Sequence, residues 1–248
     1  MTTFTTPITW TSAHPTTTQF NEQIRDNINN LHEQIELLRA ALTSECYMLA
    51  TTSSPFMFTG ISGGSLAAGT IIDANHPGVY QFTSTGGNVG GSVGLGAAGQ
   101  ILIAGQEQAE FIFYLDTVSN IYTRMGFLDA ISVSAPTDGV WVDINAATVA
   151  GKTANNTTSS TTSSTYTASA TTWYRATIVI NSAASSVTFT LYDAAGSSLW
   201  TDTLTTNIPT GAGRLVGFEF QSWKTTAGAG TLAELDYIKL YTPRTLTR

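Results

Sequence analysis

The chain has 248 residues, of which 42% are hydrophobic and 11% are charged, and its formal net charge is −7 at pH 7. This hydrophobic fraction can build a core, and the scarcity of charge means that hydroxyl and amide side chains must cover much of the surface. Ten basic residues against 17 acidic ones do not supply the positive face that a phosphate backbone requires, so we expect no nucleic-acid binding.

Two further features of the sequence limit the class of protein to which the chain can belong. Cys46 is the only cysteine, which excludes an internal disulfide. Residues 1–10 have neither a basic nor an apolar stretch, and no run of about 18 apolar residues occurs anywhere. We therefore expect no signal peptide, no membrane contact, and synthesis in a reducing cytoplasm.

A heptad pattern occupies the N-terminal part of the chain. Its apolar residues recur in alternating steps of four and three, and Phe20 adds an anchor before them. Thr16 followed by Gln19 resembles a capping box, so the pattern predicts a helix over about residues 16–43. The apolar stripe and its anchor comprise Phe20, Ile24, Ile28, Leu31, Ile35, Leu38 and Leu42.

This predicted helix needs a partner. An isolated helix of this length is marginal in water, and its remaining surface is polar. The rest of the chain offers no second helix to pair with it, so we expect the stripe to pack against copies of itself. Packing of the stripe on its own domain is the alternative.

From about residue 47 onward the hydrophobic pattern changes to period two. Short runs rich in Val, Ile, Thr and aromatic residues are bounded by Gly, Asn, Asp and Ser, which is typical of strands. The expected strands are 78–82, 109–115, 120–128, 139–144, 172–180, 186–193, 198–204, 214–223 and 233–241. They predict a mainly β fold, an antiparallel two-sheet jelly-roll sandwich at residues 47–248, preceded by a docking or oligomerisation segment at residues 1–46 that carries the amphipathic, coiled-coil-like helix.

Two segments depart from this pattern. Residues 86–99, GGNVGGSVGLGAAG, are expected to be flexible or tightly turned because of their glycine content. Residues 155–172, NNTTSSTTSSTYTASATT, are polar and of low complexity, and we expect a surface loop there. A long hairpin over the sandwich, or an arm that contacts a neighbouring subunit, is the alternative for the second segment.

No cofactor or metal site is expected. Gly94–Gly99 matches the G-x-G-x-x-G pattern, but a strand rather than the required helix follows it. His14, His32 and His76 have no metal-ligand spacing between them, and no histidine stands near Cys46 in a nucleophile arrangement.

Catalysis on a jelly roll of the glucanase type needs paired carboxylates, which commonly alternate along one strand as E-x-D-x-E. The nearest candidate pairs are Glu107 with Glu110, Asp138 with Asp143, and Glu234 with Asp236. Only the last pair has the spacing that places both side chains on one face of a strand, and it lacks the third carboxylate. We expect one carboxylate of that pair to cap a turn and the other to face solvent, and we expect no enzymatic activity.

Four tryptophans on predicted strands are candidates for glycan contact. They are Trp141, Trp173, Trp200 and Trp223. We expect most of them to fill the core, whereas any that faces outward would offer a ring on which a sugar could stack.

The N-terminal segment resembles a short motif of tailed-bacteriophage virion proteins. In that motif a Trp-containing segment leads into a helix with the pattern T-x-F-N-x-x-I-R-D-N, followed by a leucine. The matching residues are Trp10, Thr18, Phe20, Asn21, Arg25, Asp26, Asn27 and Leu31. The resemblance implies that this segment docks on other virion proteins or oligomerises on the particle.

The C-terminal half resembles the concanavalin A-like, laminin G-type jelly rolls of phage structural proteins. The likeness extends from residue 172 to residue 244 and includes a last strand DYIKLY at residues 236–241. It implies a lectin-like fold, and the missing catalytic strand separates the chain from the glycanases.

Together these resemblances imply a non-enzymatic homo-oligomer on the virion exterior, a trimer by analogy with phage fibres. Its place as a capsid decoration, tail protein or fibre is left open. A carbohydrate-binding receptor module is the alternative function, followed by a glycan hydrolase.

Overall fold

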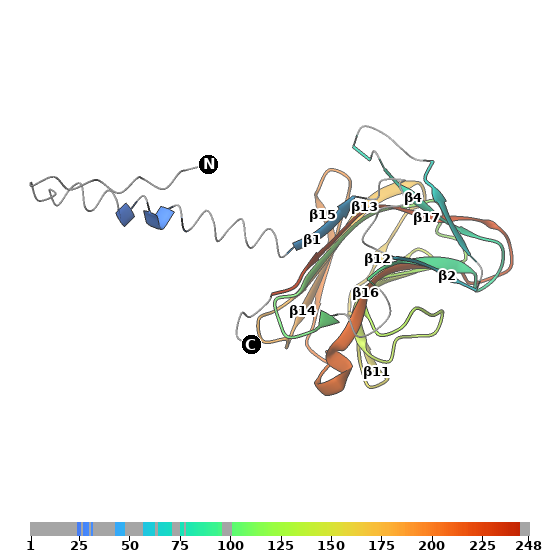
Figure 1. Ribbon diagram of the computed structural model, residues 1–248. Coiled ribbons are helices and arrows are strands. Elements are labelled where there is room, and N and C mark those ends of the chain that lie inside the picture. Colours follow the sequence, from blue (N-terminus) through green and yellow to red (C-terminus); the bar gives the residue numbers. More distant parts are fainter. Residues whose placement is uncertain are drawn as a thin grey trace, which may run out of the picture. The chain divides into compact units, whose positions relative to one another are not determined.

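The computed structural model describes residues 24–25, 27–29, 31, 43–47, 57–62, 64–70, 75–76, 78–95 and 101–243 (Figure 1). The chain divides into two compact units, Met1–Thr43 and Ser44–Arg248, which are considered separately. No helix in the described ranges is long and apolar enough to cross a membrane.

In the first unit, the described residues between 24 and 31 are helical. Three members of the predicted apolar stripe are among them, and their side chains are exposed: Ile24 by 43%, Ile28 by 61% and Leu31 by 55%. The other four members, Phe20, Ile35, Leu38 and Leu42, lie outside the described residues, so the extent of the helix remains a prediction.

The second unit contains two antiparallel sheets that form a sandwich. The first is an eight-stranded sheet with the order β15-β14-β13-β7-β17-β4-β3, and β1 also pairs with β17. Its strands are β1 (Thr43–Tyr47), β3 (Ser65–Ala68), β4 (Tyr80–Ser84), β7 (Gln108–Leu115), β13 (Thr172–Ile180), β14 (Val187–Tyr192), β15 (Ser198–Leu204) and β17 (Gly230–Tyr241).

The second sheet has nine strands in the order β11-β10-β9-β8-β16-β5-β2, with β12 paired to β10 and β6 paired to β16. Its strands are β2 (Met57–Ile61), β5 (Gly90–Gly94), β6 (Ile101–Leu102), β8 (Ile121–Leu128), β9 (Gly139–Asn145), β10 (Thr148–Asn155), β11 (Thr158–Thr161), β12 (Tyr166–Thr167) and β16 (Leu215–Lys224). Neighbouring strands along both paths are antiparallel.

The core lies between the sheets because every second side chain of each strand points inward. Phe111 of the eight-stranded sheet stacks on Phe218 of the nine-stranded sheet with ring centroids 5.2 Å apart. Phe82 and Phe113 similarly contact Phe220, and all five rings are fully buried. The structure therefore confirms the predicted mainly β, two-sheet sandwich, and all nine predicted strands are present.

The glycine-rich segment is tightly turned as predicted only at residues 86–88, and its residues 96–99 lie outside the described residues. Residues 90–94 form β5, a fully buried strand between β2 and β16. A Cβ added to Gly90 would lie 2.0 Å from the Ser222 carbonyl oxygen, and one added to Gly94 would lie 2.0 Å from that of Phe218. These positions are glycine because the backbone of β16 approaches too closely for any side chain.

The polar segment at residues 155–172 is also not the loop that we predicted. β10 turns at Asn156 and Thr157, both at positive φ, into β11, and β12 then returns to pair with β10. Asp202 of β15 accepts hydrogen bonds from the Ser164 backbone nitrogen at 2.9 Å and from its hydroxyl at 2.7 Å. Residues 155–172 therefore contain the hairpin that we gave as the alternative. The hydrogen bonds of Ser164 attach this segment to β15, the edge strand of the eight-stranded sheet.

Candidate functional site

The nine-stranded sheet carries charged and aromatic side chains on the face turned away from the core, which we call the outer face. Because side chains alternate along a strand, the core residues Met125 and Val142 are flanked by residues that point to this face. The outer-face cluster, defined by strand register, comprises Tyr122, Arg124, Trp141, Asp143, Lys152, Glu219, Gln221 and Trp223. All but Tyr122 and Lys152 are buried, which is unusual for so many polar groups.

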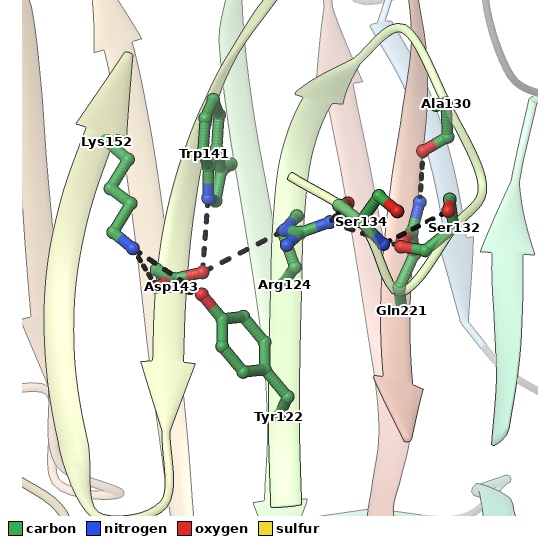
Figure 2. A network of polar contacts seen from close by, with 9 residues as sticks. All are labelled: Tyr122, Arg124, Ala130, Ser132, Ser134, Trp141, Asp143, Lys152 and Gln221. Carbon is green, nitrogen blue, oxygen red and sulfur yellow. Dashed lines mark hydrogen bonds and ion pairs between the residues drawn. The ribbon is translucent and has the colours of Figure 1, made fainter. Parts of the chain in front are cut away.

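Asp143 lies at the centre of this cluster (Figure 2). The Tyr122 hydroxyl donates a hydrogen bond to Asp143 Oδ2 at 2.6 Å, and Trp141 Nε1 donates to Oδ1 at 3.2 Å. Lys152 Nζ forms an ion pair with Oδ2 at 2.6 Å, and Arg124 Nε lies 3.8 Å from Oδ1. Four side chains from three strands thus converge on one buried carboxylate, and their hydrogen bonds and charges compensate its burial.

The same contacts shift two pKa values. Burial disfavours the charged form of Lys152, but the attraction and hydrogen bond of the Asp143 carboxylate outweigh it and raise the pKa of Lys152 above its usual value. Burial and the same carboxylate also raise the pKa of Tyr122. The tyrosine therefore keeps its proton for the hydrogen bond, and the lysine keeps its charge.

The Arg124 guanidinium lies among three aromatic rings. Its Cζ is 5.3, 5.8 and 5.0 Å from the ring centroids of Tyr122, Trp141 and Trp223. Tyr122 and Trp223 also stack on one another, with centroids 4.7 Å apart. The rings attract the cation through their negative faces and hold the guanidinium in a defined plane.

A ten-residue hairpin loop, the Asp129–Asp138 loop between β8 and β9, folds back over part of the cluster (Figure 2). Arg124 Nη1 donates hydrogen bonds to the carbonyl oxygens of Ser132 at 3.3 Å and Ser134 at 2.9 Å. Gln221 Nε2 donates to the carbonyl oxygen of Ala130 at 2.8 Å. The sheet thus fixes the loop through two side chains.

Sequence reasoning missed one signal in β16. Glu219, Gln221 and Trp223 alternate along this strand and all point to the outer face, beside the β5 residues that they pair with. The Ser92 hydroxyl of β5 donates a short hydrogen bond to Glu219, which occupies the room left by Gly94. The E-x-Q-x-W pattern, polar residues at period two in an otherwise apolar strand, could have indicated this face.

The structure brings together two of the four tryptophans that we considered for glycan contact. Trp141 and Trp223 both belong to the outer-face cluster, but each is only 2% exposed. Trp200 is 7% exposed, belongs to the core and donates from Nε1 to the Ser164 hydroxyl at 3.1 Å. These three rings are covered: Trp200 fills the core, as we expected of most tryptophans, whereas Trp141 and Trp223 are buried on the outer face.

Trp173 lies on the outer side of the eight-stranded sheet and is partly exposed. The His76 ring stacks on it at a centroid distance of 3.7 Å and an interplanar angle of 8°. One face of the indole is therefore already occupied. A sugar-binding role for Trp173 stays a prediction for its remaining surface.

The alternating pair Glu234 and Asp236 is buried, so the expectation that one carboxylate faces solvent was wrong. Glu234 accepts hydrogen bonds from the Thr70 backbone nitrogen at 3.2 Å and from Gln81 Nε2 at 2.8 Å. Asp236 Oδ2 lies 2.8 Å from His76 Nδ1. Thr70 and His76 come from the segment between β3 and β4, and their contacts hold the carboxylates in place.

Asp116 is a third carboxylate that interacts with Glu234. Its burial is the larger cause and repulsion from Glu234 the smaller one that together raise the pKa of Asp116 to about 6. Among the described residues, no group of three or more His, Cys, Asp and Glu side chains is arranged to hold a metal ion.

The other sequence candidates are dispersed. Glu107 caps a turn by accepting hydrogen bonds from the backbone nitrogens of Ala104 and Gly105, both at 2.8 Å, and Glu110 pairs with Arg175 at 3.3 Å. His14, His32 and residues 96–99 of the G-x-G-x-x-G pattern lie outside the described residues. Asp138 accepts a hydrogen bond from the Asn156 backbone nitrogen at 2.8 Å at the base of the Asp129–Asp138 loop.

Comparison with known proteins identifies a family and a fold. The model of a family described as SO2946-like, C-terminal domain, matches residues 75–236, whereas no curated protein matches the chain significantly. Among solved structures, the chain is similar to the protein of unknown function SO2946 from Shewanella oneidensis MR-1, with a TM-score of 0.64 and 19% identity over 82% of this chain and 89% of that one.

More distant structures include proteins with named activities. Lectin II from Ulex europaeus has a TM-score of 0.54 and 12% identity, over 80% of this chain and 97% of the lectin. A prokaryotic β-1,3-1,4-glucanase derived from a mouse hindgut metagenome has a TM-score of 0.54 and 9% identity, over 80% and 98%. At these identities the likeness concerns the fold, which lectins and a lichenase share.

Proposed function

The chain belongs to the SO2946-like family through the C-terminal domain at residues 75–236, and from this premise we propose that its β-sandwich is a non-catalytic module that recognises carbohydrate. The observation that carries the proposal is the outer-face cluster. Sugar sites combine aromatic surface with a few fixed hydrogen-bonding groups, and the cluster holds both in rigid contact. Lectins among the structures of similar fold support the choice of ligand.

The accessible part of the cluster is its edge at Tyr122 and Lys152, the two members that are partly exposed. The Tyr122 ring is backed by Trp223, and its hydroxyl is held by Asp143. Because Trp223 and Asp143 already hold the Tyr122 ring in place, the ring loses little conformational freedom when a sugar stacks on it. Lys152 beside it supplies a donor for sugar oxygens.

Hydrolysis is the less favoured function because the carboxylates of this face are separated and engaged. Asp143 and Glu219 lie two strands apart, with β8 and its Arg124 between them. Glycoside hydrolysis needs two carboxyl groups that face one bond, one of them able to donate a proton. The positions that alternate with Glu219 on β16 carry an amide and an indole instead of further carboxylates.

The test is binding of soluble oligosaccharides by calorimetry, with cellotetraose, laminaritetraose, maltotetraose and chitotetraose as probes. We expect the parent protein to bind at least one probe and Tyr122→Ala to weaken that binding by about tenfold, the cost of one aromatic–sugar contact. Tyr192→Ala is the matched control, because Tyr192 is also partly exposed and stacks on an arginine, Arg175, but on the other sheet.

Two results would contradict this proposal. Absence of binding by every probe would remove the recognition function, and an equal loss in both tyrosine variants would remove the site. Release of reducing sugar by the parent protein would favour the hydrolase instead.

The N-terminal helix supports a second part of the proposal, that the module is carried on the exterior of a tailed-phage virion as a homo-oligomer, a trimer by analogy with fibres. Ile24, Ile28 and Leu31 follow the heptad spacing and are exposed in the single chain. The occupant that matches such a stripe is the same stripe of another copy. Capsid, tail and fibre are the alternative positions on the particle, with other virion proteins as partners of the segment.

Sedimentation velocity of Leu31→Asp tests the helix. We expect the parent chain to sediment as an oligomer and Leu31→Asp to sediment as a monomer. A carboxylate in the heptad seam would have to be buried between the helices without a partner, which is unfavourable enough to separate them. Asn29→Asp adds a carboxylate at an exposed position outside the stripe and should leave the mass unchanged. A Leu31→Asp variant with the parent's mass would show that the stripe is not the assembly element.

A further inference from the structure

In the part of the chain that the structure describes, two buried polar atoms on the side chains that hold the Asp129–Asp138 loop lack hydrogen-bond partners. Gln221 is fully buried and uses its amide nitrogen on Ala130, while its Oε1 accepts no hydrogen bond. Arg124 Nε is buried and has no hydrogen-bond partner among the described residues, and Asp143 Oδ1 lies 3.8 Å from it, too far for a hydrogen bond. A buried donor or acceptor without a hydrogen-bond partner costs free energy. Native proteins therefore rarely leave such a group unpaired without a reason.

The two atoms belong to one place on the sheet. Arg124 of β8 and Gln221 of β16 are directly opposite one another in the antiparallel register. Both side chains point to the outer face, and both hold the same loop through its carbonyl oxygens (Figure 2). One atom is an acceptor and the other a donor, so a single kind of group satisfies both.

We propose that a hydroxyl group of the bound carbohydrate reaches beneath the Asp129–Asp138 loop and pairs with Gln221 Oε1 and Arg124 Nε; this inference rests on the function proposed above. A hydroxyl both donates and accepts, which matches this pair. Tyr122, the partly exposed ring beside Arg124, supplies apolar surface for the carbon-bound hydrogens of a sugar. The ligand class is therefore a neutral polyol such as a hexose unit.

Both atoms are inaccessible to solvent, and the side chains that carry them hold the Asp129–Asp138 loop, so we expect the loop to lift when a sugar enters. Three hydrogen bonds from Arg124 and Gln221 to loop carbonyls oppose that movement. Sugar hydroxyls can replace carbonyl oxygens as acceptors for the same donors. When the loop is displaced, the hydrogen bonds from Arg124 and Gln221 to loop carbonyls are replaced by hydrogen bonds to sugar hydroxyls. Two further hydrogen bonds form, at Gln221 Oε1 and Arg124 Nε.

Two substitutions at Gln221 separate the acceptor from the loop contact. Gln221→Met removes both the acceptor and the bond to Ala130, whereas Gln221→Glu removes the donor to Ala130, keeps an oxygen acceptor and adds a negative charge opposite Arg124. With the tetrasaccharide that the parent protein binds most tightly among the four probes, we expect Gln221→Met to weaken binding about tenfold, as for one lost hydrogen bond, and Gln221→Glu to stay within about threefold. Gln81→Met is the matched control, since Gln81 is a buried glutamine on the opposite sheet and should bind as the parent does.

The outcomes distinguish this inference from the proposed function. If the parent binds no probe, both fail. If the parent binds and Gln221→Met binds equally well, or if both Gln221 variants lose affinity to the same extent, the inference alone is overturned, because Gln221 then has no role or acts only through the loop. A crystal structure of the complex with an ordered water, rather than a sugar hydroxyl, on Gln221 Oε1 would overturn it as well.

Discussion

Asp143→Ala should lower the free energy of unfolding by about 3–5 kcal/mol, the cost of removing one partner from a buried charge network. The substitution leaves the buried Arg124 and the partly exposed Lys152 without their carboxylate, and it removes the acceptor of the Tyr122 and Trp141 hydrogen bonds. Urea unfolding followed by tryptophan fluorescence measures the change, because Trp141 lies in the network.

An exposed ion pair provides the control for this prediction. Glu110 and Arg175 are 3.3 Å apart, with side-chain exposures of 26% and 35%, so Glu110→Ala should cost no more than about 1 kcal/mol. Adding Lys152→Met to Asp143→Ala should recover part of the loss, since the cation that lost its partner is then gone. A cost for Asp143→Ala as small as that for Glu110→Ala would mean that the cluster contributes little to folding.

The sandwich was predictable because most of its strands alternate apolar and polar residues. Segments such as 172–180 and 187–192 bury every second side chain against one core, so the apolar residues alternate in the local sequence. β5 was missed because its residues are small. Its glycines are required by the approach of β16, more than 120 residues later in the chain, and a contact of that kind leaves no local pattern.

The candidate site was only partly predictable for the same reason. Trp141 and Trp223 could be singled out by residue type, but their meeting with Arg124 depends on strand pairing across the sheet. Glu234 and Asp236 show the opposite case. Their spacing was noticed, but their partners Thr70 and His76 lie some 160 residues away, so burial could not be foreseen.

β5 also links the fold to the site. It pairs with β16 on one side and β2 on the other, and its Ser92 holds Glu219 on the outer face. The positions without side chains on β5 give the large residues of β16 room on that face. A defect in this strand should therefore disturb both the stability of the sandwich and the geometry of the cluster.

Gly90→Ala should lower the free energy of unfolding by about 3 kcal/mol or more, because overpacking that a rigid backbone cannot relieve lies at the costly end of core substitutions. The new Cβ would lie 2.0 Å from the Ser222 carbonyl oxygen and 2.5 Å from the Trp223 Cα, so β5 and β16 would have to separate. Urea unfolding measures the loss, and near-ultraviolet circular dichroism should report a changed environment of Trp223. If the variant does not fold, its refolding yield relative to the parent gives the same ranking.

Gly86→Ala, four residues earlier, is the matched control for steric cost. Its Cβ would meet only Val89 Cγ2, at 3.9 Å, and Gly86 is not among the positive-φ positions. The added methyl group should therefore change the free energy of unfolding by less than about 1 kcal/mol, through the unfolded chain alone. If Gly90→Ala were equally mild, β16 could move away from β5 at little cost, and close backbone approach would not explain the glycines of this strand.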